Sequence, residues 1–327
     1  MLVSTDKLSD ILCCPKCHSP LVVEGEGSSC AQCGPYLTIA GQPVLIDFDN
    51  SIIDRCTLQQ YDGQSVWKRD EAESLKAKLL RYLFGNNRVA RRMLVRFLAD
   101  LKRTHTDNIM SGKATSARPL ILIIGGGAIG AGIAALYEDS EVDLVGTDIY
   151  ASPNTSFIAD GHSIPLKDAS IDAVWIQAVL EHVLDPVQVV AEIHRVLKPN
   201  GLVFADTPFM QQVHEGPYDF TRFTLSGHRW LFRHFSLIDA GMSGGPGSAA
   251  LWTVRYFVRS VVKSDKIGTA VQMLCFWLRF ADFLPTGRPG ADASSAVYFY
   301  GRRATVSIKP RDIVEFYRTQ IGRANPR

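Results

Sequence analysis

Two closely spaced pairs of cysteines near the N-terminus constrain the fold of this chain more than any other feature. Cys14 and Cys17 form one C-x2-C pair, and Cys30 and Cys33 form a second after twelve intervening residues. Two such turns present four thiolates to one tetrahedral ion, which is typical of zinc sites. Four protein ligands leave no open position for water, so we expect a structural zinc. We therefore predict a β-rich zinc ribbon over residues 1–48.

The neighbouring residues leave the individual zinc ligands open. Cys13 could replace Cys14, and His18 adjoins the first pair. The alternative for the whole set is a group of reduced structural cysteines. The spacing is that of metal ligands and not of a secreted disulfide framework. Charged residues interrupt the N-terminal segment and every long apolar run, so we expect neither a signal peptide nor a membrane span, and a cytoplasmic protein.

Composition divides the rest of the 327-residue chain, whose 46% hydrophobic and 21% charged residues are ordinary for a globular protein. We expect a basic helical linker at 49–118, an α/β domain at 119–306 and a tail at 307–327. Residues 67–118 hold thirteen Lys/Arg and five Asp/Glu, a net charge of +8. Such a stretch could follow a phosphate backbone, but a charge run on helices is more often a solvated face.

Apolar strands alternate with helical patterns in the α/β region, which predicts a parallel sheet covered by helices. The helical pattern at Val187–Leu197 ends at Lys198-Pro-Asn-Gly, a strong stop signal. The predicted strands are Leu120–Ile124, Val142–Gly146, Phe157–Ala159, Ile171–Ile176, Leu202–Asp206, Phe235–Ala240 and Val297–Gly301.

A glycine-rich loop follows the first of these strands. Residues 125–130 read Gly-Gly-Gly-Ala-Ile-Gly and are expected to open a helix. Glycines allow a tight turn and a close approach to a ligand, and a helix N-terminus favours polar or anionic groups. Asp148, at the end of the second strand, could accept hydrogen bonds from a ribose diol. This motif alone fits NAD or FAD equally well.

The downstream motifs are more specific. In order they are Asp160–Leu166, Ser170–Val174, Val179–Val183 and Glu192–Leu202. This ordered set resembles the class I S-adenosylmethionine-dependent methyltransferases, the group that includes the ubiquinone-pathway enzymes. The resemblance covers residues 119–206 and, more loosely, 207–306. It implies an α/β fold with a Rossmann-like, seven-stranded sheet.

The resemblance also implies seven residues around S-adenosylmethionine. They are Gly125, Gly127, Asp148, Asp160, Gly161, Gln177 and Ala178. The two loop glycines would line the methionine end, Asp148 would bind the ribose, the next pair would flank the adenine, and the last pair would border the methyl group and the acceptor. One departure is Ile123, which stands where the family usually carries an acid that helps to hold the amino-acid portion. This departure keeps open a dinucleotide site or a non-catalytic binding protein.

The ribbon carries a resemblance of its own. Residues 34–37 and 41–45 extend the cysteine pattern with Gly-Pro-Tyr-Leu and Gly-Gln-Pro-Val-Leu. Over the first 48 residues the chain resembles small zinc-ribbon proteins that are partners and activators of methyltransferases. A zinc ribbon joined to this fold is also known in ribosomal RNA methyltransferases.

The segment after the fifth strand concentrates polar and aromatic residues. His214–Thr224 contains His, Tyr, Asp and Arg and is expected to form a lid over the methyl acceptor. An oxygen acceptor benefits from a general base, for which His214 is the first candidate. The alternative is that Asp219 and Arg222 stabilise the loop and His214 only lines the pocket.

A helical insertion is expected at about 244–289, between the last two strands. Arg255, Arg259 and Lys263 fall on one stripe, and apolar residues fill most of the remaining arc. Wide apolar arcs are usually buried as a cover or a dimer face. The other interpretation is a peripheral contact with a membrane or a lipid-linked substrate.

The predicted function is methyl transfer from S-adenosylmethionine to a small-molecule, glycan or lipid-linked acceptor, at oxygen. An RNA methyltransferase is the first alternative, and few aromatics accompany the basic stretch to support it. A methyltransferase-fold protein without activity is the second. The sequence does not fix the oligomeric state.

Overall fold

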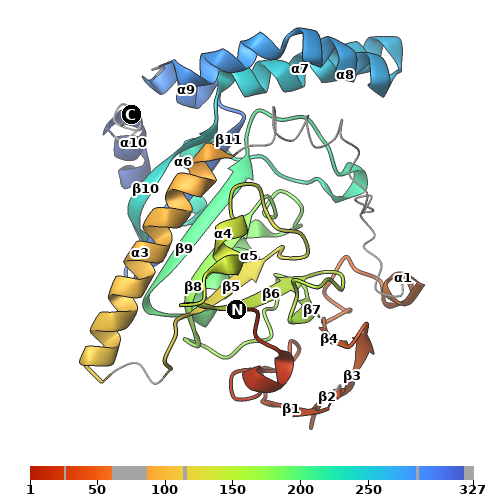
Figure 1. Ribbon diagram of the computed structural model, residues 1–327, viewed down its shortest axis with the longest axis vertical. Coiled ribbons are helices and arrows are strands. Elements are labelled where there is room, and N and C mark those ends of the chain that lie inside the picture. Colours follow the sequence, from red (N-terminus) through yellow and green to blue (C-terminus); the bar gives the residue numbers. More distant parts are fainter. Residues whose placement is uncertain (26, 61–86, 113–115, 285–286, 320–327) are drawn as a thin grey trace. The chain divides into compact units, whose positions relative to one another are not determined.

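The computed structural model describes residues 1–25, 27–60, 87–112, 116–284 and 287–319 (Figure 1). Part of the predicted linker and of its basic stretch therefore lies outside the described residues. The chain forms two compact units. The first comprises residues 1–177 and 187–203, and the second comprises residues 178–186 and 204–327.

The first unit is built on a sheet in the order β1-β2-β3-β4-β7-β6-β5-β8, followed by the start of β9. The strands β5, β6, β7 and β8 form parallel pairs, as the alternation of strands and helices predicted. Their apolar residues are almost all buried because both faces are covered. The strands are β1 (Leu21–Glu24), β2 (Gly27–Cys30), β3 (Gly34–Ile39), β4 (Gln42–Leu45), β5 (Leu120–Ile124), β6 (Asp143–Asp148), β7 (Phe157–Ala159), β8 (Ile171–Gln177) and β9 (Leu197–Pro208).

The four short strands of the cysteine-rich segment continue this sheet. β1 to β4 form an antiparallel meander, and β4 then pairs in parallel with β7, with Val44 opposite Ile158. Figure 1 shows this segment beside β7. The chain therefore has more than the seven strands predicted, because the ribbon's last strand covers an edge that would otherwise remain unpaired.

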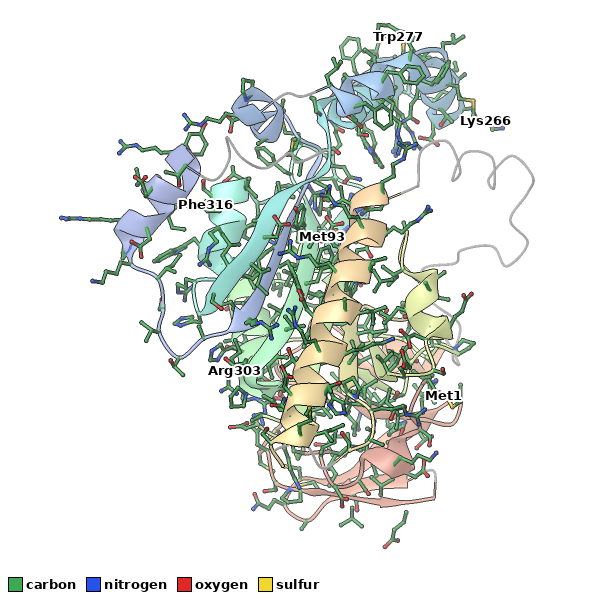
Figure 2. All side chains as sticks on the ribbon, turned by 60° about the vertical axis from the view of Figure 1, so that its left-hand side comes forward. Met1, Met93, Lys266, Trp277, Arg303 and Phe316 are labelled. Carbon is green, nitrogen blue, oxygen red and sulfur yellow. The ribbon has the colours of Figure 1, made fainter. Side chains whose placement is uncertain are left out.

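Helices of the first unit cover the sheet and frame the glycine loop. They are α1 (Arg55–Gln60), α3 (Arg88–Met110), α4 (Ala134–Glu138) and α5 (Pro186–Val196), with the 3-10 turn η1 (Thr5–Leu8). The Asn87 side chain caps α3 by accepting from the Ala90 N–H at 2.8 Å. Phe97 of α3 then packs edge-to-face on Trp175 of β8, with 5.3 Å between ring centroids. Figure 2 labels Met93, another buried residue of α3.

The second unit contains the end of β9, then β11 (Ala296–Arg303) and β10 (Phe235–Gly244) in that order. β10 and β11 are antiparallel. Phe232 stacks on Phe299 of β11 with 4.6 Å between centroids, and Phe235 packs against both rings. This aromatic core fixes α6 (Leu225–Leu231) against the hairpin.

The insertion between β10 and β11 is helical, as predicted. Its elements are α7 (Pro246–Val262), α8 (Asp265–Leu274), η3 (Phe276–Phe283) and α9 (Gly287–Asp292). Asp282 caps α7 by accepting from the Gly247 N–H at 2.7 Å and from the Ser248 N–H at 3.1 Å. The remaining helical elements of this unit are η2 (Gly216–Tyr218) and α10 (Pro310–Thr319), the latter within the predicted tail.

The outer surface of the insertion is apolar. Large exposed side chains on α7, α8 and η3 are Phe257, Val261, Val262, Ile267, Leu274, Phe276, Trp277, Phe280 and Phe283. Figure 2 shows Trp277 and Lys266 at the outer side of these helices. The expectation of a buried cover within the chain is therefore wrong for these residues. Among the described residues, no helix combines the length and the apolar character that crossing a membrane requires.

Candidate functional site

The four predicted zinc ligands lie together. The Sγ atoms of Cys14, Cys17, Cys30 and Cys33 are all within 4.8 Å of one another. Four thiolates at such separations can reach one ion at the ordinary Zn–S length of about 2.3 Å. The donor set and its spacing therefore fit a structural zinc.

Outer contacts orient two of these thiolates. The Tyr36 hydroxyl lies 2.9 Å from the Cys14 Sγ, and the Gln32 N–H donates to the Cys30 Sγ at 3.4 Å. Such donors are characteristic of thiolate metal sites. Cys13 is not in this group, and its Sγ lies 4.0 Å from the Nδ1 of His18. Cys14 is therefore the member of this Cys-Cys dipeptide that lies with the other three cysteines.

The glycine loop is held by the end of the second parallel strand. Gly125 has a φ of +76°, a conformation that favours glycine. The Gly127 N–H donates to the Asp148 Oδ2 at 2.8 Å, and the Ile149 N–H donates to the Oδ1 at 2.7 Å. A Cβ at Gly127 would lie 2.5 Å from the ring of Tyr150, so a larger residue here would displace that side chain.

The expectation that the loop opens a helix directly is wrong. α4 begins only at Ala134 and is five residues long. The Gly132 backbone has a φ of +90°, and a Cβ there would lie 2.6 Å from the carbonyl oxygen of Asn87. The Asn87 carbonyl, at the N-terminal end of α3, therefore lies close against Gly132. This contact holds residues 130–133 outside the helix. The residues that directly follow β5 are therefore loop residues and not the first turn of a helix.

The pKa values of two acidic side chains in this region are shifted in opposite directions. Burial raises the pKa of Asp148 to about 6, and the two backbone N–H donors only partly offset it. Burial also acts on Asp160, but hydrogen bonds from His162 and Ser51 outweigh it and lower its pKa. Both Asp160 oxygens already accept, from the His162 Nδ1 at 2.5 Å and from the Ser51 Oγ at 2.5 Å. The adjoining Gly161 is therefore the better-placed of this pair to approach an adenine.

The end of β8 carries the remaining predicted cofactor residues. The Gln177 Nε2 donates to the Ala131 carbonyl at 3.2 Å, and its Oε1 lies against Gly130. Gln177 thus ties β8 to the glycine loop. Ala178 has a φ of +55°, a strained conformation of the kind found at functional sites. Ile123 is buried in β5, and its side chain contacts Gly126.

The predicted lid residue His214 lies in a polar network of the second unit. Its Nδ1 is 3.2 Å from the Gln212 carbonyl and 3.3 Å from the Asp219 carboxylate. Both groups are acceptors, whereas the Arg222 Nη2, which can only donate, lies farther away at 3.4 Å and is already bound to Asp219. This balance favours a proton on Nδ1 and a lone pair on Nε2. Arg222 pairs with Asp219, as one alternative predicted. Burial would raise the pKa of Asp219, but hydrogen bonds from Arg222 and the His214 backbone hold it at about 2.

Sequence reasoning missed two residues that the fold brings beside His214. Ligand atoms of Glu181, His182 and His214 all lie within 4.8 Å of one another. Burial raises the pKa of Glu181 to about 8 and lowers the pKa of His182. The adjacent Glu and His were a usable signal, but only the fold shows that a histidine 32 positions later joins them.

Comparison with known proteins supports a methyltransferase domain in this chain. Residues 125–205 match the family described as "Methyltransferase domain". An uncharacterised protein in a Streptomyces fradiae transposon is 45% identical over 51 residues, which is 16% of this chain and 15% of that protein. The chain thus spans less than a sixth of the length of this curated relative.

Two solved structures of similar fold are weaker matches. The Haemonchus contortus phosphoethanolamine N-methyltransferase 2 with S-adenosyl-L-methionine is 16% identical, with 70% of this chain and 57% of that chain covered and a TM-score of 0.40. A complex of the Haloferax volcanii Trm112 methyltransferase activator with a methyltransferase is also 16% identical, with 67% and 97% covered and a TM-score of 0.39.

The family match spans the glycine loop and the motifs that follow it. Counted within the domain, the strands run 3-2-1-4-5 in the first unit and 5-7-6 in the second, with the loop after strand 1. The chain therefore contains a methyltransferase domain at residues 125–205 and carries a four-cysteine group of the zinc-binding type near its N-terminus.

Proposed function

We propose that this protein transfers a methyl group from S-adenosylmethionine to an oxygen of a small-molecule or glycan acceptor that is linked to a lipid. The observation that carries the cofactor assignment is the contact between Asp148 and the Gly127 N–H, 2.8 Å long. This contact places the glycine loop next to a carboxylate. The loop could then approach the methionine end of the cofactor while the carboxylate accepts from the ribose diol.

The cofactor residues have distinct expected roles. Gly125 and Gly127 would allow the methionine end to approach the backbone, and Asp148 would accept from the ribose hydroxyls. Gly161, supported by Asp160, would flank the adenine. Gln177 and the adjoining Ala178 would border the methyl group and the acceptor.

His214 is the proposed acceptor-side residue. Its Nε2 keeps a lone pair that can take a proton from a hydroxyl, because Nδ1 donates to fixed acceptors. His214→Ala should reduce turnover much more than cofactor affinity. Equal losses in both would contradict a catalytic role.

The lipid-linked acceptor is supported by the exposed apolar surface of α7, α8 and η3. Phe257 and Trp277 are 67% and 57% exposed, and the basic residues Lys263 and Lys266 are also exposed. An apolar surface with a basic margin suits the interface of an anionic membrane.

Vesicle flotation tests this acceptor assignment. The protein should float with vesicles that contain anionic lipid, and the double variant Trp277→Ser/Phe280→Ser should not. Val95→Ser, which changes an exposed residue of α3, is the matched control. Failure of the unaltered protein to float would remove the lipid-linked acceptor and leave methyl transfer in place.

The RNA alternative is less well supported. Within the described part of the basic stretch, Lys102 pairs with Asp139 and Glu141, and Arg103 pairs with Asp100. These partners reduce the net charge that α3 offers to phosphates. Salt-dependent binding of RNA would nevertheless favour this alternative over a lipid-linked acceptor.

A further inference from the structure

We propose that Glu181, His182 and His214 form a second metal site, for a divalent transition-metal cation such as zinc. The three side chains lie within the second unit, outside the cysteine site. Two imidazoles and one carboxylate are the protein ligands of many zinc sites that keep a position open for water or substrate.

The hydrogen bonds of both histidines leave one ring nitrogen free for a metal. The His182 Nδ1 lies 2.7 Å from the Tyr218 carbonyl, which can only accept, so this nitrogen carries the proton. The Nδ1 of His214 lies closer to the acceptors Gln212 and Asp219, at 3.2 and 3.3 Å, than to the donor Arg222 at 3.4 Å, which favours the same tautomer. Metal-binding histidines typically donate their other ring N–H to a carbonyl or a carboxylate.

The buried Glu181 carboxylate also lacks a partner. Glu181 is 1% exposed, and neither of its side-chain oxygens has a hydrogen-bond partner among the residues that the structure describes. Its Oε1 lies 3.6 Å from the His182 Nε2. A buried carboxylate oxygen and an imidazole lone pair repel each other unless a cation or a proton lies between them. A metal ion at this point would satisfy all three ligands.

The charged groups beside the cluster already have partners of their own. Arg222 is committed to Asp219, which also orients His214. Asp206 accepts from the hydroxyl of Ser243 in β10. The ion would therefore neutralise Glu181 without displacing an existing ion pair.

The role of this ion in methyl transfer rests on the proposed function, whereas its binding does not. A bound cation lowers the pKa of a coordinated hydroxyl. The proton leaves to water, the oxygen attacks the methyl carbon, and the carbon–sulfur bond breaks to release S-adenosylhomocysteine. With the ion bound, His214 would hold the cation, and the cation would take over the activation of the hydroxyl that His214 would otherwise perform as the base.

Calorimetric titration with Zn²⁺ tests the site without any cofactor. The full-length protein is first loaded with one zinc at its cysteines and dialysed. We expect one further equivalent to bind, and His182→Asn or His214→Asn to abolish it. Glu181→Gln should weaken it by at least about tenfold. His194→Asn, which changes a histidine of α5 outside the cluster, should bind like the unaltered protein.

Thermal melting separates loss of the site from loss of the fold. Before the second equivalent is added, all variants should melt near the unaltered protein. Added Zn²⁺ should raise the melting temperature of the unaltered protein and of His194→Asn only. Binding of a single zinc per chain by the unaltered protein would overturn the proposal, as would a second equivalent that survives in His182→Asn and His214→Asn. Either result would leave cofactor binding unaffected.

Discussion

The Ser51 hydroxyl donates to the Asp160 Oδ2 at 2.5 Å, which joins the segment after the cysteine-rich strands to the loop proposed to flank the adenine. The two residues are 109 positions apart, and both belong to the first unit. A second link nearby is the Ser163 hydroxyl, which donates to the Pro15 carbonyl at 2.6 Å. These two hydrogen bonds therefore connect the N-terminal segment to the loop that contains Asp160 and Ser163.

The hydrogen bond from Ser51 to Asp160 predicts the effect of Ser51→Ala. Removing the hydroxyl leaves one oxygen of a buried carboxylate unpaired, at a cost of about 1–3 kcal/mol. The affinity for S-adenosylhomocysteine should fall severalfold in calorimetry. Ser116→Ala, which removes a local and exposed hydrogen bond, is the control. Equal affinity in both variants would contradict a coupling between the ribbon and the loop.

Loss of a cysteine ligand should release the structural zinc. Cys30→Ser removes one of four thiolates, so the ribbon should lose its metal and the soluble yield should fall. Zinc displaced by a mercurial reagent measures the thiolate-bound ion alone. Cys56→Ser, at an exposed cysteine outside the site, should retain one thiolate-bound zinc per chain. The assignment fails if Cys30→Ser retains it too.

Cofactor affinity should depend on pH through Asp148. Its pKa is raised to about 6, so the carboxylate is ionised above that pH and protonated below it. The ionised form accepts from the ribose hydroxyls, and affinity should fall about tenfold per pH unit below 6. Calorimetry with S-adenosylhomocysteine at pH 5, 6 and 7.5 measures this. In Asp148→Asn the affinity should be low and independent of pH; a pH profile like that of the unaltered protein would show that another group is responsible.

Acid should destabilise the second unit through His228. Burial lowers the pKa of this histidine to about 3, and neither ring nitrogen has a hydrogen-bond partner in the described part of the chain. The unfolded chain binds a proton near pH 6.5, but the folded one does not. Stability is therefore complete above pH 6.5 and is lost by about 1.4 kcal/mol per unit as the pH falls toward 3. Denaturant unfolding of His228→Phe should show a smaller loss, and an unchanged slope would exclude His228 as its source.

Local signals predicted much of the fold. The apolar runs at Leu120–Ile124 and Phe157–Ala159 match β5 and β7 residue for residue, because buried parallel strands need continuous apolar sequence. The Lys198-Pro-Asn-Gly stop signal ends α5 at Val196. The pairing of β4 with β7 was not predictable, because the exposed edge of β7 is a property of the assembled sheet.

The candidate site was less accessible from sequence. Spacing predicts the cysteine group, because each pair occupies one turn, but only the fold distinguishes Cys14 from Cys13. The contact of α3 with Gly132 depends on tertiary packing, so the late start of α4 carries no local signal. Likewise, the approach of His214 to Glu181 and His182 depends on how a loop folds back.

The most direct test of the central claim is the thermal stabilisation of the purified protein by S-adenosylmethionine, S-adenosylhomocysteine, NAD and FAD in parallel. A ligand at 100 times its dissociation constant stabilises by about 2.7 kcal/mol, which is readily measured. We expect the two adenosyl compounds alone to raise the melting temperature, despite Ile123, and Asp148→Asn to remove the effect. Stabilisation by NAD or FAD, or by none of the four, would contradict this account.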